Sequence, residues 1–112
     1  MKEAESPIPL ELDIQQANEL LETGKAVFLD VREAIELQVC RIGDPIHMPM
    51  GEIPLNWNTL PRDKPLIVYC HHGRRSMMAT LFLRQHGFNN ACSLSGGIDA
   101  WALKIDPSLV RY

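Results

Sequence analysis

The sequence has 112 residues, of which 46% are hydrophobic, and a formal net charge of −3. This length predicts one domain over residues 1–112 with enough apolar residues to bury a sizeable core. The acidic balance, with a pI near 5.7, gives no general reason to expect binding of nucleic acid or of an acidic membrane surface.

The three cysteines stand at positions 40, 70 and 92 and form no CxxC pair. An odd number at these spacings indicates free thiols, not a disulfide framework or a zinc site, which fits a reducing compartment. Residues 1–7 are polar, include Pro7, and are expected to be flexible. They contain no apolar signal core, and no run approaches membrane-spanning length, so we expect a cytoplasmic protein.

The chain opens with a predicted edge strand over residues 8–12, where Pro9 is tolerated because it needs no ladder hydrogen bond. Asp13 has the character of a helix N-cap, and Gln16 stands three residues later as its capping-box partner. An apolar stripe at helical spacing follows until Gly24, which ends the helix.

The middle of the chain alternates between short apolar runs and helical patterns. A strand is predicted over residues 26–31, a short helix over 33–39 and a brief strand over 46–48. Residues 51–60 fit either a short helix or a packed loop, and residues 61–65 form a turn.

The next apolar run, from Leu66, reads as a buried strand that ends in Cys70. A polar loop follows, and a helix is predicted from about Arg75 to His86. Gly87 then takes the left-handed position after the helix, with Phe88 packed back on Leu83.

A last strand is predicted over residues 91–94, a turn over 95–97 and a short helix over 98–103 that carries Trp101. A tail begins at Asp106. The alternation of strands and helices predicts an α/β protein whose mostly parallel sheet is covered on both faces. Ligand sites in such sheets lie at the carboxyl ends of the strands, where we place Cys70 and Asp30.

Cys70 is the candidate nucleophile because a strand, a tight loop and a helix start place its thiol over a helix N-terminus. Backbone N–H groups and the helix dipole favour an anion there, and Arg74 and Arg75 add positive charge. Such surroundings lower the pKa of a cysteine and make it reactive. The alternative is an inert cysteine that acts as a small buried hydrophobic residue.

Three stretches together resemble the rhodanese-like sulfurtransferase domain. Residues 30–33, Asp-Val-Arg-Glu, look like the D-V-R-E segment of that family, and residues 70–76 look like its C-x-x-G-x-[RK]-S active loop. Residues 94–101 look like its closing L-x-G-G-x-x-x-W segment. The three occur in the order of the family, and the resemblance extends from about Pro9 to Trp101, as in a stand-alone single-domain member.

The resemblance implies a three-layer α/β/α fold with a five-stranded parallel sheet. It also implies a double displacement in which Cys70 takes the outer sulfur of a donor such as thiosulfate, releases sulfite and becomes a persulfide. A thiophilic acceptor, either cyanide or a thiol such as that of reduced thioredoxin, then removes the sulfur. No metal or organic cofactor is required. Dividing the transfer into two steps is the general advantage of covalent catalysis.

The resemblance also assigns roles within the loop. The amides from His71 to Ser76 would surround the sulfur, and Gly73 would allow the tight turn. Arg75, and with it Arg74, would hold the anionic donor, unless one of them is only a solvated charge at the helix start. The side chains of His71 and His72 either tune the choice of donor or are merely exposed.

Outside the loop, Asp30 and Arg32 are expected to support the site by tying strand-end loops together. Trp101 and the turn at Gly96 and Gly97 are expected to serve in packing. His47 is not expected to be a ligand.

The sequence departs from the family after Glu36, where the usual G-H-I-P-G-A is replaced by residues 40–45, Cys-Arg-Ile-Gly-Asp-Pro. Only Ile42 is retained. The family's path for that turn and the role of its His therefore do not carry over to this segment, and Cys40 is either a second reactive thiol or an inert one.

Two other functions compete with sulfur transfer to a small molecule. Phosphatases and arsenate reductases of the same fold place five residues between the cysteine and the arginine, whereas four separate Cys70 from Arg75 here. The shorter loop favours a single sulfur over a tetrahedral oxyanion. A sulfur-relay carrier between proteins would use the same persulfide with a protein donor.

Overall fold

Five strands form one parallel sheet in the order β1-β5-β4-β2-β3 in the computed structural model, which describes residues 8–112. The strands are β1 (Glu11–Leu12), β2 (Val27–Asp30), β3 (Ile46–His47), β4 (Leu66–Tyr69) and β5 (Ala91–Leu94). The predicted parallel α/β sheet is thereby confirmed. The expectation that residues 1–7 are flexible lies outside the described residues.

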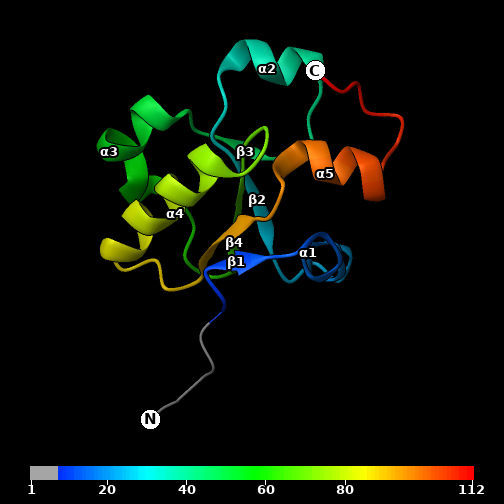
Figure 1. The fold of residues 1–112 in the computed structure, drawn as a ribbon. Helices are drawn as coiled ribbons and strands as arrows, with labels where there is room; N and C mark the ends of the chain where they lie inside the picture. Colours follow the sequence, from blue (N-terminus) through cyan, green and yellow to red (C-terminus); the bar gives the residue numbers. More distant parts are fainter. Residues whose placement is uncertain (1–7) are drawn as a thin grey trace.

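The helices cover both faces of this sheet, as Figure 1 shows. They are α1 (Ile14–Glu22), α2 (Ala34–Val39), α3 (Ile53–Asn56), α4 (Arg74–Gln85) and α5 (Gly97–Lys104), with single 3-10 turns at Met50–Glu52 and Trp57–Thr59 on either side of α3. Helices α1 and α5 lie on one face, α3 and α4 on the other, and α2 lies above the carboxyl ends of the strands. This is the expected three-layer α/β/α arrangement.

The hydrophobic core is divided by the sheet into two clusters, one on each face. Phe28, Ile67 and Tyr69 point toward α1 and α5, whereas their strand neighbours Leu29 and Val68 point toward α3 and α4. Successive side chains of a strand point to opposite faces, so strands covered on both sides must be apolar throughout. The four consecutive buried residues of β4 follow this pattern, since the strand is covered by helices on both faces of the sheet.

Two predicted helix ends are confirmed in atomic detail. The Asp13 carboxylate accepts a hydrogen bond from the Gln16 amide at 2.8 Å, and the Gln16 side chain accepts one from the Asp13 amide at 3.1 Å. At the C-terminal end of α4, Gly87 is left-handed with φ +93°, and the Phe88 amide donates to the Leu83 carbonyl at 3.0 Å. Local side-chain and backbone chemistry sets these ends, so the sequence alone reveals them.

Several predicted boundaries were too wide or misplaced. The strand expected over residues 8–12 is only Glu11–Leu12, because β1 has a strand partner only where it meets β5. The strands predicted over 26–31 and 46–48 each lose terminal residues in the same way. Helix α4 starts at Arg74, one residue before the predicted start.

The ambiguous stretch over residues 51–60 is helical, and its short turns bury Ile53 and Leu60 beneath the α4 face.

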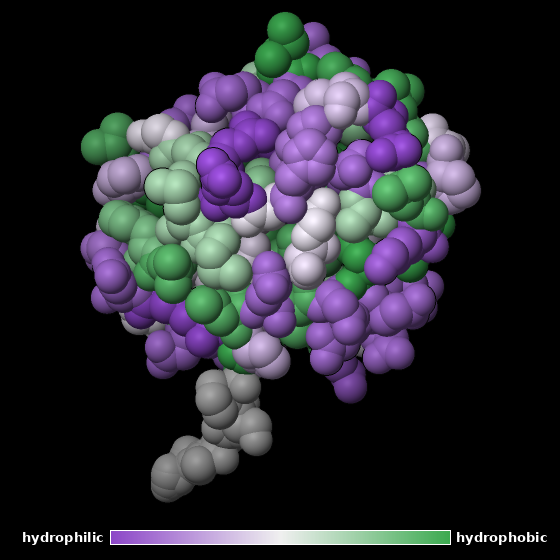
Figure 2. Space-filling model, viewed as in Figure 1, coloured by the Kyte–Doolittle hydropathy of each residue, from purple (hydrophilic) through white to green (hydrophobic). Residues whose placement is uncertain are grey.

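Helix α2 departs from an ordinary amphipathic helix, since Ile35 is 71% exposed. Figure 2 shows hydrophobic side chains interspersed with polar ones over the α3 and α4 side of the molecule. Among the described residues, the helices are all too short or too polar to cross a membrane.

The packing of α4 on the sheet gives a test of the core. Leu83 is fully buried, whereas Leu81, on the same helix, is 46% exposed. Replacing Leu83 with alanine should lower the free energy of unfolding by about 2–5 kcal/mol, because the lost apolar contacts leave a cavity. Leu81→Ala should change it by less than about 1 kcal/mol. Urea unfolding of both variants measures the difference, and equal losses would contradict this packing.

Candidate active site

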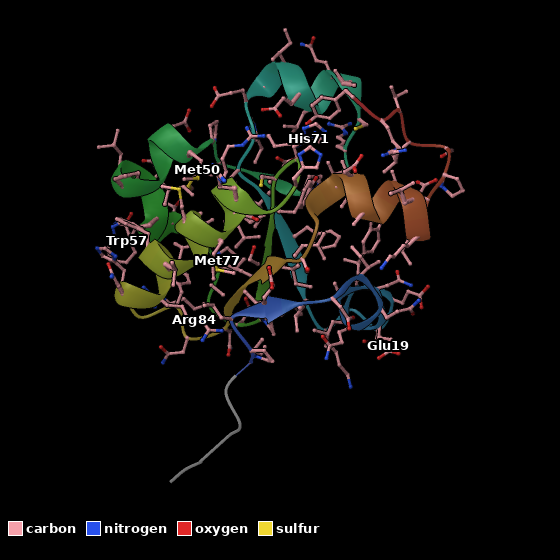
Figure 3. All side chains as sticks on the ribbon, in the orientation of Figure 1. Glu19, Met50, Trp57, His71, Met77 and Arg84 are labelled. Carbon is pink, nitrogen blue, oxygen red and sulfur yellow. The ribbon has the colours of Figure 1, made fainter. Side chains whose placement is uncertain are left out.

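The candidate nucleophile lies where β4 ends, at the centre of the sheet edge formed by the strands' carboxyl ends. Cys70 directly follows Tyr69, and Tyr69 is in register with Asp30 of the neighbouring strand. The chain then turns through Gly73, which has φ +116° and serves as the N-cap of α4. Figure 3 shows His71 in this loop, directly beneath α2. The predicted strand, loop and helix therefore meet at the thiol.

Backbone amides of the loop point at the sulfur of Cys70. The amide of Gly73 donates to Sγ at 3.1 Å and that of Ser76 at 3.3 Å. The protonated Cys70 thiol donates to the Ser76 hydroxyl oxygen at 3.6 Å, and that hydroxyl donates to the Gly73 carbonyl at 3.1 Å and lies 2.8 Å from the Ser93 hydroxyl. The two amides, at the positive end of a 12-residue helix, form a cradle around the sulfur that favours a negative charge.

The loop lowers the pKa of Cys70 although the residue is only 1% exposed. Burial by itself raises the pKa of a thiol, since it disfavours the charged form. The hydrogen bonds from the Ser76 hydroxyl and from the amides of Ser76, Gly73 and His72 favour the thiolate and outweigh that burial. These contacts favour the interpretation of Cys70 as a reactive thiol over that of an inert buried cysteine.

The first turn of α5 supports the backbone of the thiol loop. The amides of Ile98 and Asp99 donate to the carbonyls of Cys70 and His71 at 2.9 and 3.1 Å. Gly97 has φ +63°, and a Cβ there would clash with both of those carbonyl oxygens. The start of α5 thus holds the backbone of the thiol loop directly, and Gly97, expected only to pack, allows the two segments to approach closely.

The two loop arginines differ in their surroundings. Arg75 makes a two-pronged ion pair with Glu36 of α2, with N–O distances of 2.7 and 2.9 Å. Hydrogen bonds from Arg75 lower the pKa of Glu36 to about 2, so the pair stays charged at neutral pH. Arg74 is exposed at the start of α4. The guanidinium of Arg75 is therefore held in place by Glu36, whereas Arg74 is exposed to solvent.

The histidines form a stack beside the loop. The His71 ring lies 3.9 Å from that of His72 and 3.8 Å from that of Tyr112, measured between ring centroids. Burial, and then the neighbouring His72, lower the pKa of His71, which keeps it neutral near pH 7. His72 is exposed on the rim.

One potential metal-binding set occurs among the described residues: His71, His72 and Asp99, with ligand atoms within 4.8 Å of one another. The two imidazole rings are stacked, with 27° between their planes, so their nitrogen lone pairs do not converge on one point. Asp99 is already paired with Arg111 at 2.9 Å. These engagements within the group make it a poor metal site.

Asp30 and Arg32 form an ion pair with both side chains fully buried and a shortest N–O distance of 2.7 Å. The Arg32 guanidinium also donates to the carbonyls of Cys40 and Glu36, at 2.7 and 3.3 Å. His47 donates its Nε2 hydrogen to the Arg32 carbonyl at 2.7 Å. This cluster joins the end of β2 to α2 and to its C-cap residue, Cys40.

Comparison with known proteins places this geometry in a family. Residues 13–104 match the rhodanese-like domain. The chain belongs to the rhodanese-like domain family. A sulfurtransferase of Allochromatium vinosum is 33% identical over 93 residues, covering 82% of this chain and 87% of the relative. The thiosulfate sulfurtransferase GlpE of Pseudomonas savastanoi pv. phaseolicola is 38% identical over 87 residues, with 78% and 81% coverage.

The solved structures agree. The crystal structure of a rhodanese-related protein from Thermoplasma volcanium superposes with a TM-score of 0.80 at 34% identity, covering 91% of this chain and 98% of that one. The resemblance drawn from the three sequence motifs is thereby confirmed at the level of the family. Sulfur transfer is the activity that the names of these two curated relatives share.

The remaining thiols of this rhodanese-like chain lie away from the loop amides. Cys92 is fully buried in β5, and burial raises its pKa to about 12, which keeps it protonated. Cys40 is 9% exposed and follows α2. It stands in the segment that departs from the family pattern, and its carbonyl is held by Arg32.

Sequence reasoning missed several residues around the loop. Glu36 and Tyr112 complete its charge network, and Ser93 extends the hydroxyl chain behind the thiol. Glu36 carried a faint signal, since it is the acidic residue just before the departing segment. Tyr112 carried none, because a tail without periodicity does not show where it packs.

The role of the Ser76 hydroxyl can be measured on the thiol itself. Ser76→Ala should raise the pKa of Cys70, because the thiolate loses a donor. The rate of alkylation of Cys70 by iodoacetamide, followed against pH, should then rise at higher pH than in the unchanged protein. Ser95→Ala, on the adjacent turn, is the control and should leave the profile in place. A Ser76→Ala profile that coincides with that of the unchanged protein would contradict the assignment.

Proposed function

We propose that this rhodanese-like chain is a sulfurtransferase that moves a sulfane sulfur from thiosulfate or a similar donor to a thiophilic acceptor through a persulfide on Cys70. The observation that carries the proposal is the buried Sγ of Cys70 with the amides of Gly73 and Ser76 directed at it. Contacts of this kind favour the thiolate of Cys70, which is the nucleophilic form of a cysteine.

The reaction proceeds in two displacements. The Cys70 thiolate attacks the outer sulfur of thiosulfate, the S–S bond of the donor breaks, and sulfite leaves with the electron pair. The terminal sulfur of the new persulfide is then attacked by cyanide or by a thiolate, and Cys70 leaves as the thiolate. Both forms of the enzyme are anions, so the same loop amides and helix end stabilise each of them.

The position after Arg75 supports sulfur transfer over phosphate chemistry. Ser76 occupies the place where a phosphatase loop would have its arginine, and its fully buried side chain points to Sγ and to Ser93. A hydroxyl there closes the cradle around one sulfur and supplies no guanidinium for a tetrahedral oxyanion. Phosphatase or arsenate reductase activity is accordingly the weaker alternative.

Binding of the donor falls to the loop arginines. Arg74 is exposed at the first turn of α4, and the fixed guanidinium of Arg75 lies on the α2 side of the loop. A sulfonate group suits guanidinium donors because its oxygens accept charge-assisted hydrogen bonds. The side chains of His71 and His72 form the adjoining rim. No metal or organic cofactor enters either step, and we place the reaction in the cytoplasm, where thiol acceptors are reduced.

The persulfide is the most direct test. Brief exposure of the purified protein to thiosulfate should increase its intact mass by about one sulfur atom, because covalent transfer precedes release. Cyanide or dithiothreitol should remove the added mass. Cys70→Ser should gain none, while Cys92→Ser, which changes a buried thiol away from the loop, should gain the same mass as the unchanged protein.

Absence of the mass increase with thiosulfate would contradict this donor. A mass increase that appears only with a persulfidated protein donor would identify a sulfur-relay carrier. Turnover of aryl phosphate or arsenate without any persulfide would identify the phosphatase or arsenate reductase alternative.

Donor binding gives a second prediction. Arg74→Gln should raise KM for thiosulfate about tenfold with little change in kcat, because loss of a hydrogen bond to a charged group costs about 1.5 kcal/mol or more. Lys64→Gln makes the same change in net charge at the opposite end of β4 and is the control. Steady-state kinetics at low ionic strength measures both. Equal effects of the two substitutions would show that only the overall charge matters.

A further inference from the structure

The segment after α5 returns to the thiol loop. Figure 1 shows residues 105–112 running from the end of α5 up to α2, above the sheet edge where Cys70 lies. Arg111 is anchored to Asp99 at 2.9 Å, and the Tyr112 ring stacks on His71 with only 3° between the planes. The tail thus brings an aromatic residue onto the residue next to the nucleophile.

The hydroxyl of Tyr112 connects the guanidinium of Arg32 to the carboxylate of Glu36. Nη1 of Arg32 donates to it at 2.8 Å, and the hydroxyl donates to Oε1 of Glu36 at 2.8 Å. Burial, and then the hydrogen bond to Glu36, raise the pKa of Tyr112 to about 12, although the bond from Arg32 acts in the opposite direction. The hydroxyl therefore keeps its proton, and with it its donor role, throughout the neutral range.

The carboxylate of Glu36 links Tyr112 to Arg75 of the thiol loop. Its Oε1 accepts from both Tyr112 and Arg75, while Oε2 accepts from Arg75 and from the Glu33 amide at 3.0 Å. A carboxylate held by four donors has little freedom to rotate. The Arg75 guanidinium, only partly buried, depends on that fixed carboxylate for its own position.

We propose that Tyr112 is a positioning residue of the active site: its hydroxyl bridges Arg32 and Glu36, and through Glu36 it fixes the guanidinium of Arg75 beside the Cys70 loop. The chain runs from the buried Asp30–Arg32 pair through Tyr112 and Glu36 to Arg75. In this chain, the cation Arg32 donates to the neutral Tyr112, and both Tyr112 and the cation Arg75 donate to the anion Glu36. Each side chain is therefore held by a neighbour of complementary charge or hydrogen-bonding role.

The consequence concerns the charge of the reagent that reaches Cys70. With Arg75 fixed beside the loop, an anion approaching the thiolate meets a positive charge that offsets their mutual repulsion. Without the hydroxyl, the Glu36–Arg75 pair loosens and the guanidinium spends more time in solvent. The proposal rests on the proposed function only in that thiosulfate is such an anion.

The test uses two alkylating reagents of different charge, so it does not require sulfur transfer. Iodoacetate and iodoacetamide attack the same thiolate, but only iodoacetate carries a negative charge. The ratio of their rates at Cys70, followed by peptide mass spectrometry, measures how well the site receives anions and cancels most of any change in the pKa of Cys70. Tyr112→Phe keeps the ring on His71 and removes only the hydroxyl.

We expect Tyr112→Phe to lower the iodoacetate-to-iodoacetamide ratio about threefold, the size expected for loosening one partly exposed ion pair. In the Arg75→Gln background the same substitution should have no further effect, because the residue through which it acts is absent. Val110→Ala, an exposed change in the same tail, should leave the ratio unchanged.

An unchanged ratio in Tyr112→Phe would overturn the proposal, and so would an equal decrease in the presence and absence of Arg75. KM for thiosulfate should rise in Tyr112→Phe by the same factor as the ratio falls, with kcat unchanged. If the unchanged protein forms no persulfide with thiosulfate, the proposed function fails, while the alkylation ratio still decides the role of Tyr112.

Discussion

The hydrogen bonds from the Gly73 and Ser76 amides to the sulfur of Cys70 are the interaction on which the site depends. They require a thiol at the end of a buried strand, a left-handed glycine and a helix that starts at once. The parallel sheet provides the first, because its central strand ends beneath α4. Burial alone would disfavour the Cys70 thiolate. Because hydrogen bonds to a charged group are stronger where water is excluded, the same burial strengthens the stabilisation of the thiolate by the amides.

Around this cradle, the fold uses two kinds of support. The turn at Gly97 holds the loop backbone from below through hydrogen bonds to its carbonyls. From above, Glu36 holds Arg75, and the buried Asp30–Arg32 pair holds the loops at the strand ends. Removing one partner of a fully buried ion pair leaves an uncompensated charge, so such a pair fixes geometry whatever its net contribution to stability.

The sequence-based predictions were accurate where the interacting residues are close together in the sequence and inaccurate where they are far apart. The capping box at Asp13, the left-handed Gly87 and the strand-loop-helix at Cys70 involve neighbours within a few residues, and all were found. The length of β1 depends on how far it runs beside β5, and the contact of Tyr112 with Arg32 joins residues 80 positions apart. Neither the length of β1 nor the contact of Tyr112 with Arg32 can be predicted from the residues next to it in the sequence.

By itself, the sequence determined the α/β class and the family and pointed to Cys70 as the candidate nucleophile, because apolar periodicity, turn glycines and the spacing of the Cys70 loop are local properties. Only the tertiary structure decided which charges face the thiol. The sequence presents Arg74 and Arg75 as equivalent, and packing α2 above the sheet edge separates them by pairing Arg75 with Glu36. Electrostatic roles depend on distances across the fold, and those exist only once the layers have packed.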